Sequence, residues 1–325
     1  MKKYLFFTII FFCASHFSKA NLPFSATNSI LVIKNNDTLY NAWAGGLNYP
    51  LFSSIDLNGD NLKDIFVFDR SNNRISTYIN TGQAGLKAFR YDAKYVSKFP
   101  NMRGWAYCYD YNCDGKEDLF ALSSQCACGI MVYRNDFSVP TGLQFTLVEP
   151  LVRETFFGIP SNPYSNAFQP PGIADMDNDG DLDLVTFPNL QNGRLEYHKN
   201  LSIELFGHCD SLKYEYVTGC WGNFGLAIGS TNRVACFNCP CFLFTEPNPT
   251  VRANELTEDV LQYDPSDAAK QDDSIANIKL IDMDGDSDID ALIGDIGANN
   301  SLYVRNGGNN QTAEMDIQDT LWPVN

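Results

Sequence analysis

The sequence predicts an all-β chain, either a complete β-propeller or a segment of one, built of four-stranded antiparallel blades with metal-binding hairpin loops. Three observations predict this fold. An acidic nine-residue motif occurs four times, a short apolar run of strand type follows each copy, and an alternating segment then closes each repeat on an Asn. A small sheet repeated along the chain in this way is typical of propeller blades.

The acidic motif spans residues 56–64, 110–118, 175–183 and 282–290, and it places Asp or Asn at positions 1, 3, 5 and 9. Calcium takes six to eight oxygen ligands, which the alternate side chains of a short loop and a backbone carbonyl near position 7 would supply. Thiolate and imidazole are missing from these positions, which disfavours zinc and copper, and magnesium demands a stricter octahedron. The expected ligands of up to four Ca²⁺ ions are Asp56, Asn58, Asp60, Leu62, Asp64, Asp110, Asn112, Asp114, Lys116, Asp118, Asp175, Asp177, Asp179, Asp181, Asp183, Asp282, Asp284, Asp286, Asp288 and Asp290.

An EF-hand loop also begins with alternating Asp residues, but it requires a bidentate Glu at position 12. Position 12 is occupied here by Val67, Ala121, Thr186 and Ile293, which excludes the EF-hand in all four copies. Turns rich in Asp, Asn and Gly that bind no ion remain the alternative. Four copies in one register favour calcium, with a structural role for the ion.

Apolar runs of strand type follow the loops at residues 65–68, 119–122, 184–187 and 291–293, and shorter apolar runs precede them. Each loop is therefore expected to join the first two strands of a small sheet. The segments between repeats are expected to supply an outer fourth strand.

Each repeat closes on an Asn that lies 24 or 25 residues after the first Asp of its loop, namely Asn80, Asn135, Asn200 and Asn306. The four repeats are expected at about residues 46–80, 100–135, 165–200 and 275–306. Beyond them, residues 28–40 are expected to supply an outer strand, and residues 312–322 the first strand of a following blade.

The four D-x-[DN]-x-D-x-x-x-D loops with their apolar runs resemble the FG-GAP/VCBS repeat family, known from integrin α-chain propellers. The segment 291–299, with its glycine-containing turn, resembles that family as well, and the likeness covers roughly residues 46–310. The resemblance implies the propeller fold and calcium, but no particular activity. The chain is also similar to exported Bacteroidetes surface proteins, which implies further blades or a C-terminal sorting domain after Asn325.

Residues 1–20 are typical of a secretory signal, with Lys2 and Lys3 ahead of an apolar stretch and small residues at Ser18 and Ala20. We expect a mature chain, residues 21–325, that is exported and is extracellular or at the cell surface. No later apolar stretch is long enough to span a membrane. The net charge of −16 disfavours nucleic acid and anionic membranes as partners, and leaves an extracellular protein or glycan.

Nine of the ten cysteines follow the signal, four of them in the second repeat and five in a Cys-rich insertion at about residues 201–274. In an exported chain they predict disulfides, and their grouping favours local ones, with one thiol left over. The insertion is the candidate binding surface, because long loops in compact domains are often functional. The Trp residues that we would test for stacking against sugar are Trp105, Trp221 and Trp322.

The mature chain has two His, His198 and His208, and none of the common nucleophile, phosphate-loop or zinc-protease motifs. His198 falls in a closing strand, where a structural role is expected, and the clustered carboxylates are assigned to calcium. The prediction is therefore a secreted or cell-surface calcium-binding module for adhesion or ligand binding, and not an enzyme. The alternatives are a polysaccharide-active enzyme or its carbohydrate-binding accessory domain, and a structural spacer.

Overall fold

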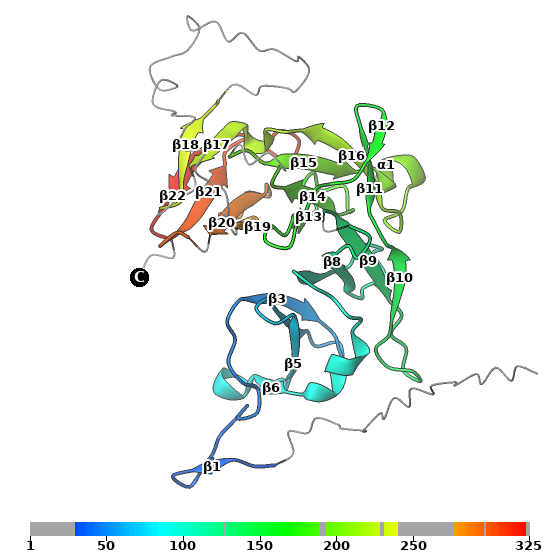
Figure 1. Ribbon diagram of the computed structural model, residues 1–325, viewed down its shortest axis with the longest axis vertical. Helices are drawn as coiled ribbons and strands as arrows, with labels where there is room; N and C mark the ends of the chain where they lie inside the picture. Colours follow the sequence, from blue (N-terminus) through cyan, green and yellow to red (C-terminus); the bar gives the residue numbers. More distant parts are fainter. Residues whose placement is uncertain are drawn as a thin grey trace, which may run out of the picture.

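Each of the four acidic loops joins the first two strands of its own antiparallel sheet, and the sheets are arranged as a four-bladed β-propeller (Figure 1). The computed structural model describes residues 30–126, 128–188, 193–227, 231–239, 276–295 and 297–322. The predicted signal at residues 1–20 and much of the predicted insertion lie outside these residues.

The blades follow the chain order and share one strand pattern. Blade 1 contains β3 (Pro50–Ile55), β4 (Asp64–Asp69), β5 (Arg74–Asn80) and β6 (Phe89–Tyr91). Blade 2 contains β7 (Ala106–Tyr109), β8 (Asp118–Leu122), β9 (Ile130–Asn135) and β10 (Phe145–Glu149). Blade 3 contains β13 (Gly172–Ala174), β14 (Asp183–Thr186), β15 (Glu196–Asn200) and β16 (Lys213–Thr218). Blade 4 contains β19 (Ala276–Ile281), β20 (Asp290–Asp295), β21 (Ser301–Asn306) and β22 (Met315–Asp319).

The second strand of each blade begins at position 9 of its loop and runs through the middle of its sheet. In β8 and β14 every residue is buried, because neighbouring strands and neighbouring blades cover both faces. This explains why these segments are continuous apolar runs and do not alternate.

The outer strands β6, β10, β16 and β22 confirm the prediction that the segments between repeats supply a fourth strand. The prediction that residues 312–322 begin a further blade is wrong. The side chain of Asn306 accepts hydrogen bonds from the backbone of Gly308 (3.1 Å) and Glu314 (2.9 Å), which turns the chain back so that β22 pairs with β21. The N-terminal segment forms a separate hairpin, β1 (Ile33–Lys34) with β2 (Asp37–Thr38), and adds no strand to blade 1.

Blade 3 is extended and blade 4 is flanked by further hairpins. The hairpin of β11 (Arg153–Phe156) and β12 (Ile159–Ser161) joins blade 3 through parallel pairing of β11 with β16, which gives a six-stranded sheet. The hairpin of β17 (Phe224–Ala227) and β18 (Arg233–Phe237) lies beside β22, where the Val234 N–H donates to the side chain of Gln318 at 2.8 Å. Short helical turns complete the fold at α1 (Ser202–Phe206), Gly85–Lys87, Ala93–Lys98 and Trp221–Asn223.

Two apolar cores hold neighbouring blades together, one across blades 1, 2 and part of 3, and one across blades 3 and 4. Between blades 1 and 2, Phe99 packs against Phe66 at 4.7 Å and Phe145 at 5.0 Å between ring centroids. Between blades 3 and 4, a Cβ added to Gly172 would lie 2.7 Å from Leu280, so the close approach of β13 and β19 requires glycine there.

A single guanidinium connects all four blades. Arg70, which follows β4, donates to the carbonyls of Gly104 (3.2 Å) and Ala167 (2.7 Å) and to the side chain of Asn277 (3.1 Å). These acceptors precede or lie in the first strands of blades 2, 3 and 4. Burial lowers the pKa of Arg70 from its ordinary value, which reflects the low-dielectric centre in which this residue lies.

The structure describes both short-range and long-range disulfides. Cys126–Cys128 and Cys236–Cys239 are local, as the sequence predicts. The prediction of local disulfides is wrong for Cys113–Cys209, which joins residues 96 positions apart, because the segment after β15 folds back beside the second loop. Cys220 is also disulfide-bonded, and Cys108 carries a free, buried thiol.

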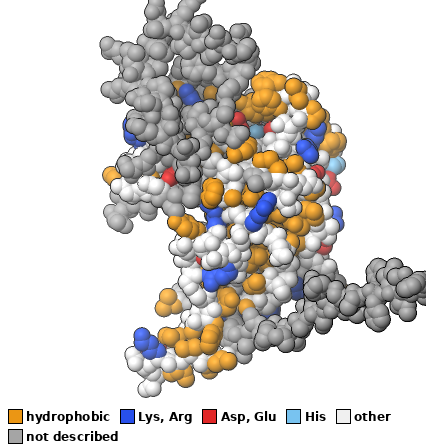
Figure 2. Space-filling view, in the orientation of Figure 1, with side chains coloured by type: hydrophobic (Ala, Val, Ile, Leu, Met, Phe, Trp, Pro, Cys, Tyr) orange, Lys and Arg blue, Asp and Glu red, His pale blue; other side chains and the backbone are white. Residues whose placement is uncertain are grey.

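No helix among the described residues is long and apolar enough to cross a membrane. The face shown in Figure 2 carries few acidic side chains, although the chain has 39 Asp and Glu residues.

Candidate metal centres

We number the acidic loops 1 to 4 in chain order (residues 56–64, 110–118, 175–183 and 282–290), and the same backbone geometry is found in all four. The carboxylate at position 1 accepts hydrogen bonds from backbone N–H groups three to five residues further on, as between Asp175 and Gly180 at 3.0 Å. Positions 4 and 6 have positive φ in every loop, which explains why they are mostly Asn and Gly. The residues at these two positions are Gly59, Asn61, Cys113, Gly115, Asn178, Gly180, Gly285 and Ser287.

The Asp at position 9 joins the two ends of each loop. Its carboxylate is fully buried, at 0% exposure in Asp64, Asp118, Asp183 and Asp290. One oxygen accepts the N–H of position 2 at 2.9–3.2 Å, and the other accepts the N–H of the closing Asn at 2.7–2.8 Å. This pair of contacts ties the loop to the third strand and fixes the spacing between loop and Asn that the sequence shows.

Loops 3 and 4 bring three carboxylates together. Ligand oxygens of Asp175, Asp177 and Asp183 lie within 4.8 Å of one another, and so do those of Asp282, Asp284 and Asp290. Loops 1 and 2 are described throughout and form no such group of three carboxylates. Each has Asn in place of Asp at position 3, where an amide oxygen replaces the third charge.

The buried carboxylates of loops 3 and 4 are incompletely paired. Asp177 Oδ1, Asp181 Oδ1 and Asp288 Oδ1 are buried without a hydrogen-bond partner among the described residues. A buried carboxylate oxygen left without a partner costs free energy. A hard divalent cation would satisfy these oxygens, so the residues present fit calcium.

Burial, together with the charges of neighbouring carboxylates, raises the pKa values of several loop carboxylates. Burial raises the pKa of Asp118 to about 7 and that of Asp183 to about 8, with neighbouring Asp charges adding to the effect. Burial together with adjacent carboxylates raises the pKa of Asp179 to about 6 and that of Asp288 to about 7. In the absence of a cation, the ionised form of these groups is therefore less stable than that of an ordinary exposed carboxylate.

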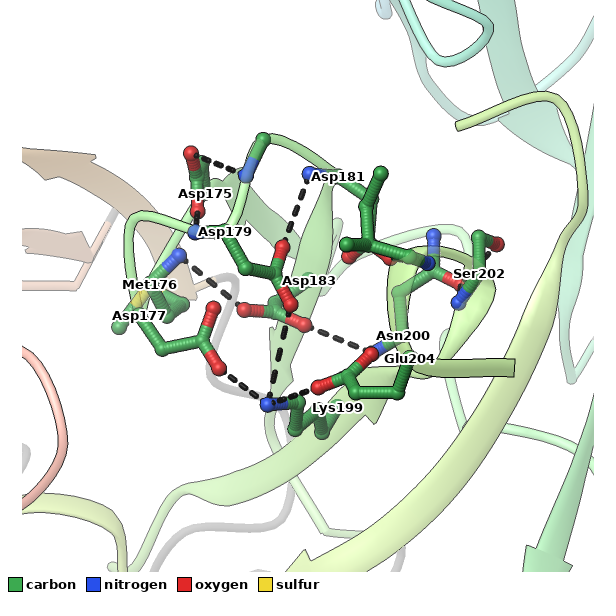
Figure 3. Close-up of polar contacts among 12 residues, drawn as sticks. Asp175, Met176, Asp177, Asp179, Asp181, Asp183, Lys199, Asn200, Ser202 and Glu204 are labelled. Carbon is green, nitrogen blue, oxygen red and sulfur yellow. Dashed lines mark hydrogen bonds and ion pairs between the residues drawn. The ribbon is translucent and has the colours of Figure 1, made fainter. Parts of the chain in front are cut away.

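Loop 3 has two charged neighbours that the sequence analysis missed (Figure 3). The Lys199 ammonium forms ion pairs with Asp177 and Glu204, and it lies 3.8 Å from Asp179 Oδ2. Burial works to lower the pKa of Lys199, but the hydrogen bonds to these carboxylates prevail and the pKa is raised.

Glu204 belongs to α1 and forms a second carboxylate group with Asp177 and Asp179. One sequence pattern points to Lys199, because the residue before the closing Asn is also basic in repeats 2 and 4 (Arg134 and Arg305). Glu204 carried no such signal, because it falls in the segment assigned to the insertion.

Neighbouring loops are joined to one another. Loops 1 and 2 are connected by the ion pair of Lys63 and Glu117, both at position 8. The Cys113–Cys209 disulfide joins loop 2 to the segment after α1, and its sulfurs lie 3.4 and 3.5 Å from the Gly180 carbonyl oxygen of loop 3. Loops 3 and 4 are connected by a 3.0 Å hydrogen bond, which the Asn178 side chain donates to the Ser287 carbonyl.

The other residues that the sequence singled out lie outside these loops. His198 is buried, with Nδ1 2.5 Å from Glu154 and Nε2 3.0 Å from Thr186, so both ring nitrogens have hydrogen-bond partners, as expected for a structural His. His208 is exposed, and its Nδ1 contacts the Asp210 carboxylate.

The candidate stacking residues differ in their exposure. Trp105 is fully buried and donates its indole N–H to Asn166, so the suggestion that it stacks against sugar is wrong. Trp221 is buried, at 4% exposure, and lines a cavity, and Trp322 is partly exposed.

Comparison with known families agrees with this geometry. The family described as FG-GAP-like repeat matches residues 56–121, which contain loop 1, strands β4 to β7, and loop 2 with most of β8. The chain therefore carries an FG-GAP-like repeat in a propeller whose loops cluster acidic side chains. No curated protein matches the chain.

Proposed function

We propose that this protein is an exported calcium-binding propeller that serves as an adhesion or ligand-binding module for an extracellular protein or glycan. Calcium binding is the part of the proposal that the geometry of the loops supports most directly. The observation that carries it is the pair of three-carboxylate groups in loops 3 and 4, with buried carboxylate oxygens left unpaired.

Export is supported by the disulfides. Disulfides persist in oxidising compartments and are rare in reducing ones, and the described residues form several of them. The signal-like residues 1–20 point the same way. Two features support the binding role. The chain has acidic repeats, and its clustered carboxylates are better suited to holding a metal ion than to catalysis.

Thermal unfolding and calorimetry test the calcium assignment. Binding to the folded state alone stabilises it by about 2.7 kcal/mol per site at a calcium concentration of 100 times Kd. We expect chelation to lower Tm markedly, calcium to restore it, and magnesium to restore it less. Asp177→Asn should reduce the heat of calcium binding, whereas Asp37→Asn, an exposed carboxylate outside the loops, should not. A melting curve unchanged by chelation would contradict the assignment.

A second experiment tests the binding role. The full chain with calcium is screened on arrays of glycans and extracellular proteins, and bound glycans are analysed for cleavage. Binding without turnover supports the module. Measurable cleavage of a polysaccharide would contradict it, and so would a chain that calcium stabilises but that binds nothing on either array.

A further inference from the structure

A cavity of about 190 Å³ lies between blades 3 and 4, directly beside two of the acidic loops. Loop 3 contributes Met176 to its wall and loop 4 contributes Ile289. The turn between β21 and β22 forms another wall with Asn310 and Gln311, and Trp221 adds an aromatic surface. The cavity is therefore shaped by both candidate metal centres and by the segment that follows β16.

The described lining of this cavity carries no formal charge. It consists of amide, hydroxyl, aromatic and aliphatic side chains together with Gly222 and Cys220, without any Lys, Arg, Asp or Glu. A charged ligand would find no side chain of opposite charge to offset its desolvation. Amide side chains both donate and accept hydrogen bonds, and aromatic rings cover apolar C–H surface, so the lining matches a neutral ring with several hydroxyls.

The size of the cavity limits the ligand. Sites for drug-sized molecules are typically about 300–1,000 Å³, and this one is smaller. A single pyranose residue suits this volume, whereas a stretch of polysaccharide does not.

Three hydrogen bonds connect the cavity wall to loop 3. The side chains of Asn310 and Gln311 both donate to the Asp177 carbonyl, at 3.0 and 3.3 Å. The Tyr197 hydroxyl, also in the wall, donates to Asp183 Oδ2 at 3.1 Å. Asp177 and Asp183 belong to the carboxylate group of loop 3, as Figure 3 shows, so a cation held there fixes the backbone and carboxylate on which the wall rests.

We propose that this cavity binds a single neutral sugar residue and that calcium in loop 3 orders it. The inference deepens the ligand-binding role proposed above and rests on it. It assigns the recognition to the junction of blades 3 and 4, with Asn310 and Gln311 as residues that determine specificity.

Titration of the full chain with neutral methyl glycosides tests the proposal. Methyl glycosides of glucose, galactose, mannose and N-acetylglucosamine are compared with glucuronic acid and with an uncharged peptide, by saturation-transfer NMR and calorimetry. We expect one of the neutral glycosides to bind with calcium and to bind at least about tenfold more weakly after chelation. Binding of the acid or the peptide alone would overturn the proposal.

Variants locate the site. Gln311→Ala and Asn310→Ala are expected to weaken glycoside binding by about fivefold to tenfold each, since each removes hydrogen-bonding groups from the wall. Gln83→Ala, an exposed Gln in a turn of blade 1, is the matched control and should leave binding unchanged. Tm in calcium should stay within a few degrees for all three variants, which separates loss of the site from misfolding.

The failure of this inference differs from the failure of the proposed function. If calcium stabilises the chain and no neutral glycoside binds, the sugar site is overturned and calcium binding stands. If glycoside binds equally well with and without calcium, the coupling through Asp177 is overturned. If chelation leaves Tm unchanged, the calcium assignment itself fails.

Discussion

Replacing Asp290 by Asn removes one of the two carboxylate oxygens that hold loop 4 closed. Oδ1 accepts the Asn306 N–H at 2.8 Å, and Oδ2 accepts both the Met283 N–H and the Tyr303 hydroxyl at 3.0 Å. An amide side chain of the same shape has one acceptor oxygen and one NH₂ group. The variant therefore keeps the volume of the side chain and changes only its hydrogen bonding and charge.

The cost follows from these contacts. In the best arrangement the amide oxygen stays with Asn306, and the Tyr303 hydroxyl rotates to accept from the new NH₂ group, which leaves the partly buried Met283 N–H without this partner. A buried donor left unpaired costs about 1–3 kcal/mol, with a partly buried one at the low end, and weakening the bond to Asn306 from charged to neutral costs about 1 kcal/mol more. Relief of repulsion with nearby Asp side chains offsets part of this, so we expect a net loss of about 1–3 kcal/mol.

Urea and thermal unfolding in the presence of chelator measure this loss. For a chain of this size, it corresponds to a fall in Tm of about 1.5–5 °C. The matched control is Asp284→Asn, at position 3 of the same loop, where the side chain is exposed. Asp284→Asn should reduce the stabilisation by calcium and leave the metal-free Tm unchanged. An Asp290→Asn protein as stable as the wild type in chelator would refute the view that position 9 closes the hairpin.

The remaining predictions concern charge, the blade junction and covalent links. In chelator, the buried loop carboxylates have pKa values of about 6 to 8 in the folded state and about 4 in the unfolded state, so the folded state binds more protons. The stability that these groups contribute is therefore fully present below pH of about 4 and is lost as the pH rises to about 8. With calcium the trend should reverse, because protons compete with the ion, and melting curves across pH with and without calcium check both signs. Arg70→Lys removes the guanidinium that donates to three acceptors, so we expect the free energy of unfolding measured in urea to fall by about 2–4 kcal/mol while the calcium affinity is retained. An unchanged stability would contradict the role of Arg70 in connecting the blades. Replacing Cys113 and Cys209 together by Ser should cost up to about 4–5 kcal/mol, from the 96-residue separation, and no change in the urea midpoint would count against it. Lys199→Met should raise calcium affinity severalfold in calorimetry, and an unchanged affinity would show that its ammonium does not compete with the ion.

The repeat could be predicted from the sequence because its spacing is fixed by backbone hydrogen bonds within one blade. The backbone N–H of the Asn at the end of each third strand donates to position 9, and in repeats 1 to 3 the Asn side chain also donates to the carbonyl of position 8, as in Asn135 with Asp118 and Glu117. These contacts hold the Asn at a spacing of 24 or 25 residues from the start of the loop. The exclusion of the EF-hand agrees with this geometry, because each loop is followed by a strand and not by a helix.

Contacts between repeats could not be predicted in this way. Local patterns do not show that Cys209 returns to loop 2, that Arg70 reaches Asn277, or that Glu204 approaches loop 3. Each of these contacts joins segments that are distant in sequence or follow irregular turns. The prediction for Trp105 is wrong for the same reason, because its burial depends on the packing of blade 2 beside the segment before blade 3.

The contacts between neighbouring loops couple the four candidate centres to one another. A cation in loop 4 would restrain Ser287, whose carbonyl accepts from Asn178 of loop 3, and a cation in loop 3 would restrain Gly180, against which the Cys113–Cys209 disulfide packs. A restraint that crosses a contact acts in both directions, because coupling free energies between sites are reciprocal. Whatever factor calcium in loop 4 adds to the affinity of loop 3, calcium in loop 3 must therefore add to loop 4.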